Sequence, residues 1–310
     1  MTIVVAGATG LAGSAIVRAY EKTGQRVIGI NRSVCDLLDR DATIDFIKKA
    51  KPAIVVDAAA KVGGIGANNA FPVEFLADNV RIQSNLMEAA HAADVEKFIF
   101  LGSSCIYPRD CAQPIKEEYL LTGPLEETNS AYAIAKIAGI ELIKSFRKEY
   151  DRKWISLMPT NLYGPKDNFE LQGSHVLPAF IRRFVEATKS GAKKETLWGT
   201  GSPKREFLHV DDLAAAVLHL GEKYDEPGQL NIGTGEDLTI KELAEMVAEL
   251  AGFKGEIAWD STKPDGTPRK VLDVTKAKSL GWAPKISLRD GIAATIDWYK
   301  QAATKGELRR

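Results

Sequence analysis

The chain has 310 residues, an apolar fraction of 45%, and 41 Lys and Arg against 41 Asp and Glu. This length suggests one large domain or two closely joined ones, and the apolar fraction is sufficient for a complete core. The balanced charge gives no long-range attraction to nucleic acid or to an anionic membrane, and no window reaches the roughly 18 apolar residues of a membrane helix. We therefore expect neither nucleic acid nor membrane as a partner.

The cysteines are few and odd in number: Cys35, Cys105 and Cys111. Such a set does not make a disulfide framework and is typical of a reducing compartment. Met1 runs directly into an apolar segment, without the basic and apolar stretches of a signal peptide. These features predict a cytoplasmic protein.

Short β-rich runs alternate with helical patterns along the first half of the chain. The predicted strands are Thr2–Ala6, Arg26–Ile30, Ala53–Val56, Lys97–Leu101 and Trp154–Met158. The predicted helices are Leu11–Lys22, Ala42–Ala50, Pro72–Ala93 and Ala131–Tyr150. This alternation implies crossover connections and hence an α/β fold with a doubly wound parallel sheet of the Rossmann type.

The regular alternation ends after Met158. A stretch rich in Gly, Pro and Asn follows, the pattern of the sheet domain returns near Phe207–Gly235, and a further helix is predicted over Thr239–Gly252. We therefore predict a sheet domain of residues 1–160 plus about 207–238. A smaller lobe of about 161–206 plus 239–310 interleaves with it.

A glycine pattern separates the first predicted strand from the first predicted helix. Its residues are Gly7, Ala8, Thr9, Gly10, Leu11, Ala12 and Gly13, which form G-x-x-G-x-x-G. Glycines at this place let the backbone approach a pyrophosphate, and a helix N-terminus favours an anion. The pattern predicts a dinucleotide site; the alternative is a turn that only packs the helix against the strand.

The residues after the second and third strands bear on the choice of cofactor. A site for NAD usually has an acidic residue after the second strand, but here Asn31 and Arg32 follow. The guanidinium of Arg32 suits a 2′-phosphate, so we predict NADP(H) rather than NAD; the alternative is a solvated arginine. Asp36 either contacts the adenine or caps the next segment. The small residues that follow Asp57 either border the cofactor or simply pack closely.

Tyr132 and Lys136 lie four residues apart on a predicted helix and therefore share one face. An ammonium near a phenol is expected to lower the pKa of the phenol, and it can also hold the nicotinamide ribose. The alternative is a surface pair. The fourth strand leads into Leu101-Gly102-Ser103-Ser104-Cys105-Ile106-Tyr107-Pro108, so a serine at its end can hydrogen-bond a substrate carbonyl.

The glycine pattern, the strand-end serine and the Y-x-x-x-K pair resemble the extended short-chain dehydrogenase/reductase family. In that family the serine lies four residues before a Tyr-Gly or Tyr-Pro pair, which selects Ser103 rather than Ser104. More restricted segments resemble the GDP-L-fucose synthases of this family. These are Ala60–Ile65, Gly102–Pro108, Pro159–Pro165, Asp167–Phe169, Ser174–Val176 and Arg205–Asp212.

The resemblance implies an epimerase-reductase that converts GDP-4-keto-6-deoxy-D-mannose and NADPH into GDP-L-fucose. It implies that Ser103, Tyr132 and Lys136 carry out the reduction. In the epimerisation it implies that Cys105 is the base and His175 the acid. It places along the cofactor Leu101, Gly102, Ser103, Ser104, Lys136, Pro159, Thr160, Asn161, Leu162 and His175. It assigns to the substrate lobe Arg183 and Arg205 for the diphosphate, Trp198 near the sugar nucleotide, and Asp265 and Lys270 to close the pocket. It also implies a homodimer formed through Pro72–Ala93 and Ala131–Tyr150.

Other interpretations of these residues stay open. Cys105 can be a small buried residue, His175 the start of a helix, Trp198 a core residue and Asp265 a turn residue. The chain can also be a UDP-sugar 4-epimerase that retains NAD, or a non-catalytic NADP-binding sensor or scaffold on the same fold. A non-catalytic protein of this kind would be expected to lack Tyr132 or Lys136, and both are present. No segment has the spacing of metal ligands, so no metal is expected.

Overall fold

The computed structural model describes residues 1–170, 173–263 and 265–308, so the predicted end of the substrate lobe at residue 310 lies outside it. Six parallel strands form the central sheet, in the order β2-β1-β3-β4-β5-β10. They are β1 Thr2–Ala6, β2 Arg26–Ile30, β3 Ile54–Asp57, β4 Lys97–Leu101, β5 Ile155–Pro159 and β10 Gln229–Ile232. The prediction of a doubly wound parallel sheet is confirmed.

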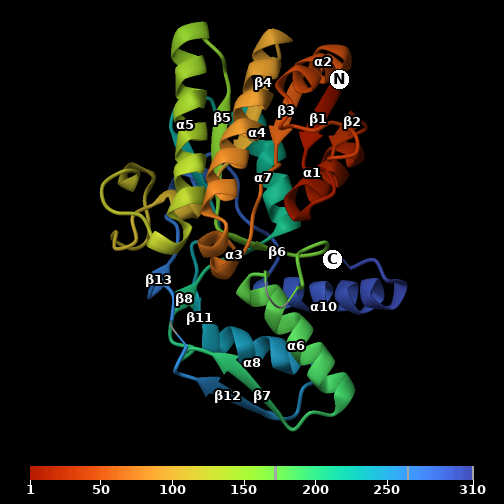
Figure 1. Cartoon of the computed structure of the whole chain (residues 1–310), viewed down its shortest axis with the longest axis vertical. Helices are drawn as coiled ribbons and strands as arrows, with labels where there is room; N and C mark the ends of the chain where they lie inside the picture. The colour runs from red at the N-terminus through yellow and green to blue at the C-terminus, as the bar shows by residue number, and fades with distance from the viewer. Residues whose placement is uncertain (171–172, 264, 309–310) are drawn as a thin grey trace.

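Helices cover both faces of this sheet (Figure 1). One face carries α1 (Leu11–Lys22) and α7 (Val210–Lys223), and the other carries α2 (Arg40–Ala50), α4 (Pro72–Ala92) and α5 (Ser130–Tyr150). Successive residues of a strand point to opposite faces, so β1 places Ile3 and Val5 in one core and Val4 and Ala6 in the other. Burial on both sides explains why the strands are apolar throughout.

The strand order reverses beside β1. The chain passes from β1 to β2 at one edge and then returns to β3 on the other side of β1. In open α/β sheets, ligands bind in the crevice outside the carboxyl ends of the strands at such a reversal. The glycine pattern follows β1 directly, so the topology places it at this crevice.

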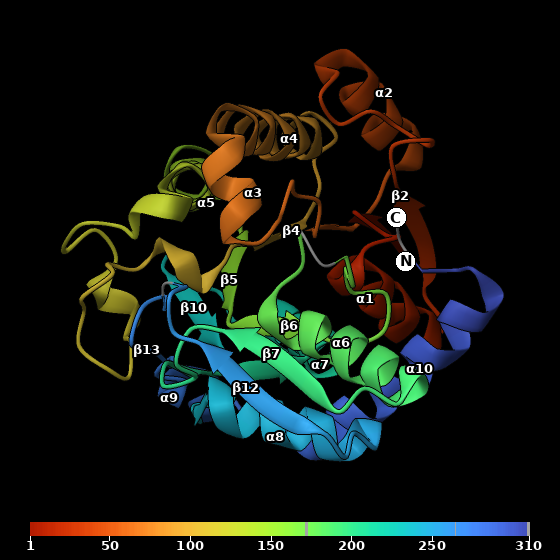
Figure 2. The same ribbon diagram turned by 60° about the horizontal axis from the view of Figure 1, so that its bottom comes forward.

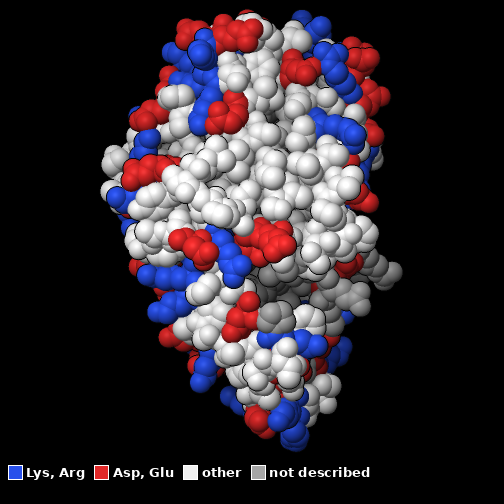
Figure 3. All heavy atoms as spheres, turned by 60° about the vertical axis from the view of Figure 1, so that its left-hand side comes forward, with Lys and Arg blue, Asp and Glu red and all other residues white. Residues whose placement is uncertain are grey.

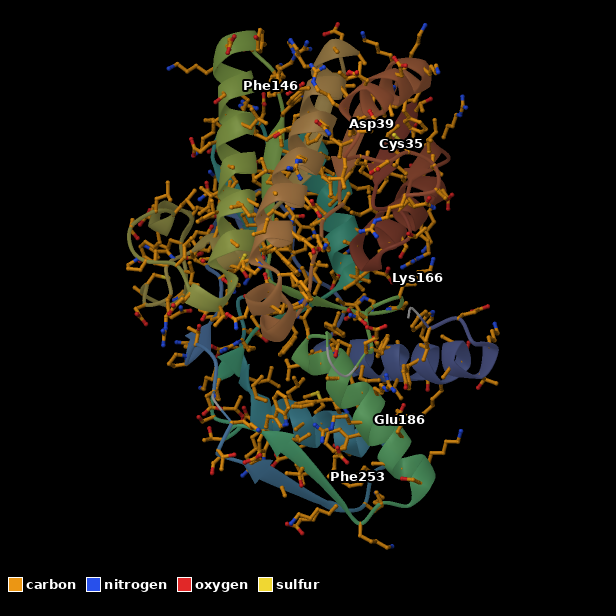
Figure 4. The ribbon with its side chains drawn as sticks, viewed as in Figure 1. Cys35, Asp39, Phe146, Lys166, Glu186 and Phe253 are labelled. Atoms are coloured by element: carbon orange, nitrogen blue, oxygen red, sulfur yellow. The ribbon has the colours of Figure 1, made fainter. Side chains whose placement is uncertain are left out.

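A second lobe lies below the carboxyl edge of the sheet (Figures 1 and 2). It contains α6 (Val176–Ser190), β7 (Lys194–Trp198), α8 (Ile240–Ala251), β12 (Glu256–Asp260) and α10 (Leu288–Lys305). The lobe has its own apolar core, in which the rings of Phe184 and Phe253 lie 5.4 Å apart. Figure 4 shows Phe253 within this lobe. The chain thus buries a second set of apolar side chains away from the sheet.

Short elements join the two parts. β8 (Lys204–Arg205) pairs with β11 (Leu238–Thr239) and β13 (Arg269–Lys270), and β6 (Asn161–Tyr163) pairs with β9 (Phe207–His209). The remaining helices are α3 (Ile65–Ala70), α9 (Thr275–Ser279), η1 (Ser104–Ile106), η2 (Glu117–Tyr119) and η3 (Glu127–Asn129). Over the described ranges, no helix has the length and apolar character needed to cross a bilayer.

The predicted bounds of the strands and helices differ from the structure by no more than two residues, and local interactions explain the differences at α2 and α8. Helix α2 begins earlier than predicted because Asp39 accepts a hydrogen bond from the Ala42 N–H at 3.0 Å. Thr239 and Gly252, predicted inside a helix, are instead the two caps of α8: Thr239 forms a capping box with Glu242, and Gly252 has φ of 82°.

Candidate active site

The glycine pattern forms the turn between β1 and α1. Gly7 has φ of 74°, and a Cβ atom there would lie 2.5 Å from the carbonyl oxygen of Ala58. A Cβ on Gly13 would lie 2.1 Å from the Gly7 oxygen. No side chain caps α1, which follows Gly10, so its first N–H groups remain available to an anion. The geometry fits the pyrophosphate of a dinucleotide.

The segment after β2 contains the three residues predicted to touch the adenosine half of the cofactor. The side-chain oxygen of Asn31 accepts hydrogen bonds within its own turn, from Ser33 and from the N–H of Val34. Asp36 accepts from the N–H of Leu38 at 3.0 Å, so it caps the local turn. Arg32 is exposed and makes no side-chain hydrogen bond or ion pair within the described residues. Its guanidinium is therefore free to meet a phosphate.

Lys136 lies on α5, directly behind the end of β4. The residue is 2% exposed. Its ammonium donates to the Leu101 carbonyl at 2.9 Å and lies 4.7 Å from the centre of the Phe100 ring and 5.9 Å from that of the Tyr132 ring. The surface-pair alternative is therefore wrong, because a buried lysine is not a solvated one.

The expected effect of Lys136 on Tyr132 is also wrong in this structure. The pKa of Tyr132 is raised rather than lowered, first because the phenol is buried and then because Cys105 and Asp57 face it. The ammonium is occupied by the Leu101 carbonyl. A phenol that keeps its proton suits a proton donor.

The end of β4 presents two serines and a cysteine. The hydroxyl oxygen of Ser103 accepts from the Cys105 N–H at 3.3 Å, which caps η1, whereas Ser104 is 2% exposed. Ser103 is therefore the one with surface open to a ligand. The pKa of the Cys105 thiol is raised, because burial outweighs the lowering effects of Lys270, Ser103 and Lys136.

Lys270 joins the two candidate epimerisation residues electrostatically. It lines a small cavity together with Cys105. His175 is exposed by surface area, but neighbouring protein groups partly desolvate its imidazole; this lowers its pKa, and Lys270 lowers it further. One ammonium thus acts on both the thiol and the imidazole.

The segment that carries His175 is held by the loop after β3. The N–H of Gly64 donates to the Gly173 carbonyl at 3.1 Å, and the side chain of Asn68 donates to the carbonyls of Gly63 and Gly64. His175 itself precedes α6 as its N-cap residue without a side-chain cap, so the imidazole is free for other contacts. Sequence reasoning gave Gly64 and Asn68 no role, although Gly64 belongs to a segment that carried the resemblance.

The other predicted cofactor residues follow β5. Pro159 ends β5, the N–H of Thr160 donates to the Ile232 carbonyl, and the amide of Asn161 donates to the Glu206 carbonyl at 2.8 Å. Leu162 lies in β6 beside Leu208. The structure therefore places this run at the same carboxyl edge as Ser103 and the glycine turn.

The predicted substrate residues divide into two groups. Lys270 and Arg205 are partners in the β13–β8 register. Both are half-buried, and partial desolvation lowers the pKa of each. Arg183 is occupied instead by Glu195 and by the Thr196 carbonyl. The structure thus brings Arg205 and Lys270 together but gives Arg183 an internal partner.

Trp198 and Asp265 lie on the outer side of the lobe. Trp198 is 71% exposed, so the core alternative is wrong, and the Lys263 ammonium lies 5.7 Å from its ring. Both carboxylate oxygens of Asp265 accept from Thr200, at 3.0 and 2.6 Å. This contact matches the turn alternative for Asp265.

Glu206 is a residue that sequence reasoning missed. It is fully buried, and its carboxylate accepts from the N–H groups of Thr234, Gly235 and Leu272 at 2.6, 2.8 and 2.9 Å. These bonds tie together the chain segments that carry Arg205 and Lys270. A charged residue directly before the apolar run Phe207-Leu208 was the available signal.

The comparisons with known proteins agree with this geometry. The model of the NAD dependent epimerase/dehydratase family matches residues 3–233. GDP-L-fucose synthase 1 of Arabidopsis thaliana is 53% identical over 96% of this chain and 92% of its own. The GDP-L-fucose synthase of Escherichia coli K12 is 50% identical, with 96% of each chain covered.

A solved structure has the same fold. The GDP-mannoheptose C4 reductase from Campylobacter jejuni with NADP bound superimposes with a TM-score of 0.89, at 36% identity over 96% of this chain and 98% of that one. The predicted resemblance is confirmed at the level of the family. The chain belongs to the NAD dependent epimerase/dehydratase family, within the extended short-chain dehydrogenases/reductases.

Proposed function

We propose that this chain is an NADPH-dependent epimerase-reductase that converts GDP-4-keto-6-deoxy-D-mannose into GDP-L-fucose. The observation that carries the proposal is the arrangement around Lys270. A simple reductase needs Ser103, Tyr132 and Lys136, but here Cys105 also lines a cavity with Lys270, and Lys270 lowers the pKa of His175. The names of the curated relatives support this substrate, and the NADP-bound solved structure supports the cofactor.

The residues of the reduction act on the carbonyl at carbon 4 of the sugar. NADPH supplies a hydride to that carbon. Ser103 orients the carbonyl oxygen, and Tyr132 gives it a proton as the negative charge develops. Lys136, whose ammonium donates to the Leu101 carbonyl here, would hold the nicotinamide ribose of the bound cofactor. The buried phenol keeps its proton at neutral pH and is therefore ready to donate it.

The residues of the epimerisation act on carbons 3 and 5. The protons there are acidic because their removal gives an enolate conjugated with the carbonyl. Inversion needs a base on one face and an acid on the other. We assign Cys105 as the base and His175 as the acid. Ser103 and Tyr132 stabilise the enolate oxygen in the same position that they use during reduction.

The test is NADPH oxidation with a panel of 4-keto nucleotide sugars. We expect the fastest turnover with GDP-4-keto-6-deoxy-D-mannose and a product inverted at carbons 3 and 5. Purified protein that retains non-exchanging NAD and interconverts UDP-sugars would support the 4-epimerase instead. Absence of turnover with every sugar tested, despite NADPH binding, would favour the non-catalytic alternative.

Arg32 tests the choice of cofactor. Arg32→Ala is expected to weaken NADPH binding by about tenfold or more and to leave NADH binding nearly unchanged, because only NADPH has a 2′-phosphate for the guanidinium to pair with. Fluorescence titration of both cofactors measures this. Arg26, an exposed arginine at the other end of β2, gives the control variant Arg26→Ala. Equal losses for both cofactors in Arg32→Ala would contradict the assignment.

We also propose a cytoplasmic homodimer that pairs through α4 and α5. Figure 3 shows a broad area with few charged side chains on the side of the molecule that carries α5. Exposed apolar side chains on these helices, or next to them in the chain, are Phe71, Val73, Ile134 and Tyr150. A second copy of the chain would remove them from water. The three free cysteines fit a reducing compartment.

Sedimentation tests the dimer. We expect a dimer at micromolar concentration, and Ile134→Glu is expected to shift it toward the monomer because a charge would be buried at the contact. Val34→Glu changes an equally exposed apolar residue (48% for each) outside these helices and serves as the control. A wild-type monomer at micromolar concentration would contradict the proposal.

A further inference from the structure

Asp57 is a fully buried carboxylate at the carboxyl end of β3 that the reaction as described does not use. Its register partner in β4 is Phe100. Partners in a parallel register point to the same face of a sheet, and Phe100 belongs to the core beneath α4 and α5. The carboxylate of Asp57 therefore lies on the face that receives Lys136.

The hydrogen bonding of Asp57 is incomplete. Oδ1 accepts from the N–H of Ala59 at 3.1 Å, and Oδ2 is buried with no hydrogen-bond partner in the described part of the chain. A buried carboxylate without a full set of partners is costly unless an opposite charge lies nearby. A cation on the same face is what such a carboxylate requires.

The ammonium of Lys136 likewise lacks a close partner of opposite charge among the described residues. Its ammonium lies over the Phe100 ring, the register neighbour of Asp57, and donates to one neutral acceptor, the Leu101 carbonyl. No carboxylate of the described residues comes within ion-pair distance of it. The ionisable groups that face it are Asp57 from β3, Cys105 from η1 and Tyr132 on its own helix.

We propose that Asp57 is a positioning residue that acts as the counter-ion of Lys136 and keeps its ammonium protonated for the nicotinamide ribose. This inference rests on the ribose-binding role proposed for Lys136. The titration behaviour agrees: burial lowers the pKa of Lys136 and Asp57 opposes that effect, while burial raises the pKa of Asp57 to about 6 and Lys136 opposes that rise. Each group thus favours the charged form of the other.

The first test is the pH dependence of NADPH affinity, measured by fluorescence titration without any sugar. Affinity is expected to fall as the pH rises and Lys136 loses its proton; in Lys136→Met this alkaline fall should disappear. Asp57→Asn keeps the shape of the side chain but removes the charge, so the fall should begin about one pH unit lower. Asp57→Glu restores a carboxylate, so the pH at which the affinity begins to fall should return toward the wild-type value.

A matched control is Asp212→Asn. Asp212 is also buried and accepts from the N–H groups of Lys285 and Ile286, away from Lys136. Its loss is expected to lower stability and to leave the alkaline fall in place. If Asp57 had a purely structural role, Asp57→Asn would also lower stability and leave the alkaline fall of NADPH affinity at the wild-type pH. That result would overturn the proposal.

A second test leaves Asp57 intact, so it holds even if the Asp57 variants do not fold. The ¹³C chemical shift of the Asp57 carboxyl group reports its titration. In Lys136→Met its pKa should rise above about 6, because the cation that lowers it is gone; an unchanged pKa would overturn the proposal. Failure of the proposed function appears differently, as wild-type protein that binds NADPH with this pH dependence but reduces no GDP-linked ketone.

Discussion

Tyr132→Phe is expected to reduce the rate of hydride transfer to the ketone at least about 100-fold, the lower end of what a positioned general acid contributes. The phenol is buried and its pKa is raised, so at neutral pH it holds the proton that the new alkoxide needs. Phenylalanine keeps the ring and its edge contact with Phe75 but has no proton to give. NADPH affinity should therefore stay near the wild-type value. Single-turnover oxidation of NADPH measures the chemical step, and fluorescence titration measures the affinity.

Tyr107→Phe is the matched control for this experiment. Tyr107 is also buried near the end of β4, but its hydroxyl donates to Asn231 at 2.6 Å and faces no substrate in the proposed mechanism. Its loss should cost roughly 1 kcal/mol of stability and leave hydride transfer within a few-fold of wild type. Near-normal reduction by Tyr132→Phe, or an equal effect of the two variants, would remove Tyr132 from the mechanism.

Cys105→Ser and His175→Ala are expected to lose solvent deuterium exchange at carbons 3 and 5 by about 100-fold or more, because each removes one of the two proton-transfer groups. Cys105→Ser should still reduce the unepimerised 4-keto sugar slowly, since Tyr132 and Lys136 remain. Mass spectrometry of the sugar recovered from deuterium oxide measures the exchange.

Cys111→Ser and His219→Ala are the matched controls. Cys111 is a second half-buried thiol, and the His219 imidazole is paired with the Leu280 carbonyl at 2.8 Å, outside the candidate active site. Both should exchange at the wild-type rate. If Cys105→Ser and His175→Ala also exchange deuterium at the wild-type rate, neither residue transfers the protons on carbons 3 and 5.

The pH dependence of exchange follows from the two shifted groups. In the assigned roles the thiolate is the base and the imidazolium is the acid. Burial raises the pKa of the thiol and lowers that of the imidazole, so exchange should hold a plateau between the two values and fall on both sides. Lys270 lowers both pKa values, and Lys270→Met should therefore move both edges of the plateau to higher pH. An unchanged pH profile in Lys270→Met would show that Lys270 does not act electrostatically on Cys105 and His175.

The local sequence was sufficient where one short segment carries the whole signal. The turn at Gly7–Gly13 was predictable because its glycine spacing lies within one short segment, although the close approach of Gly7 to Ala58 joins it to the residues after β3. The strands could be predicted because burial on both faces makes each of them an apolar run. The pairing of Tyr132 with Lys136 follows from helical spacing alone.

The tertiary structure decided what depends on contacts between distant segments. Desolvation raises the pKa of Tyr132, whereas helical spacing alone led to the expectation that Lys136 lowers it. Arg183 meets Glu195 on β7, Glu206 binds amides from two other loops, and Asp57 lies in register with Phe100 beneath Lys136. The sequence by itself determined which side chains are present and which local elements carry them. Only packing determined which charges share a dry environment, because desolvation and charge–charge effects depend on distances that linear spacing does not set.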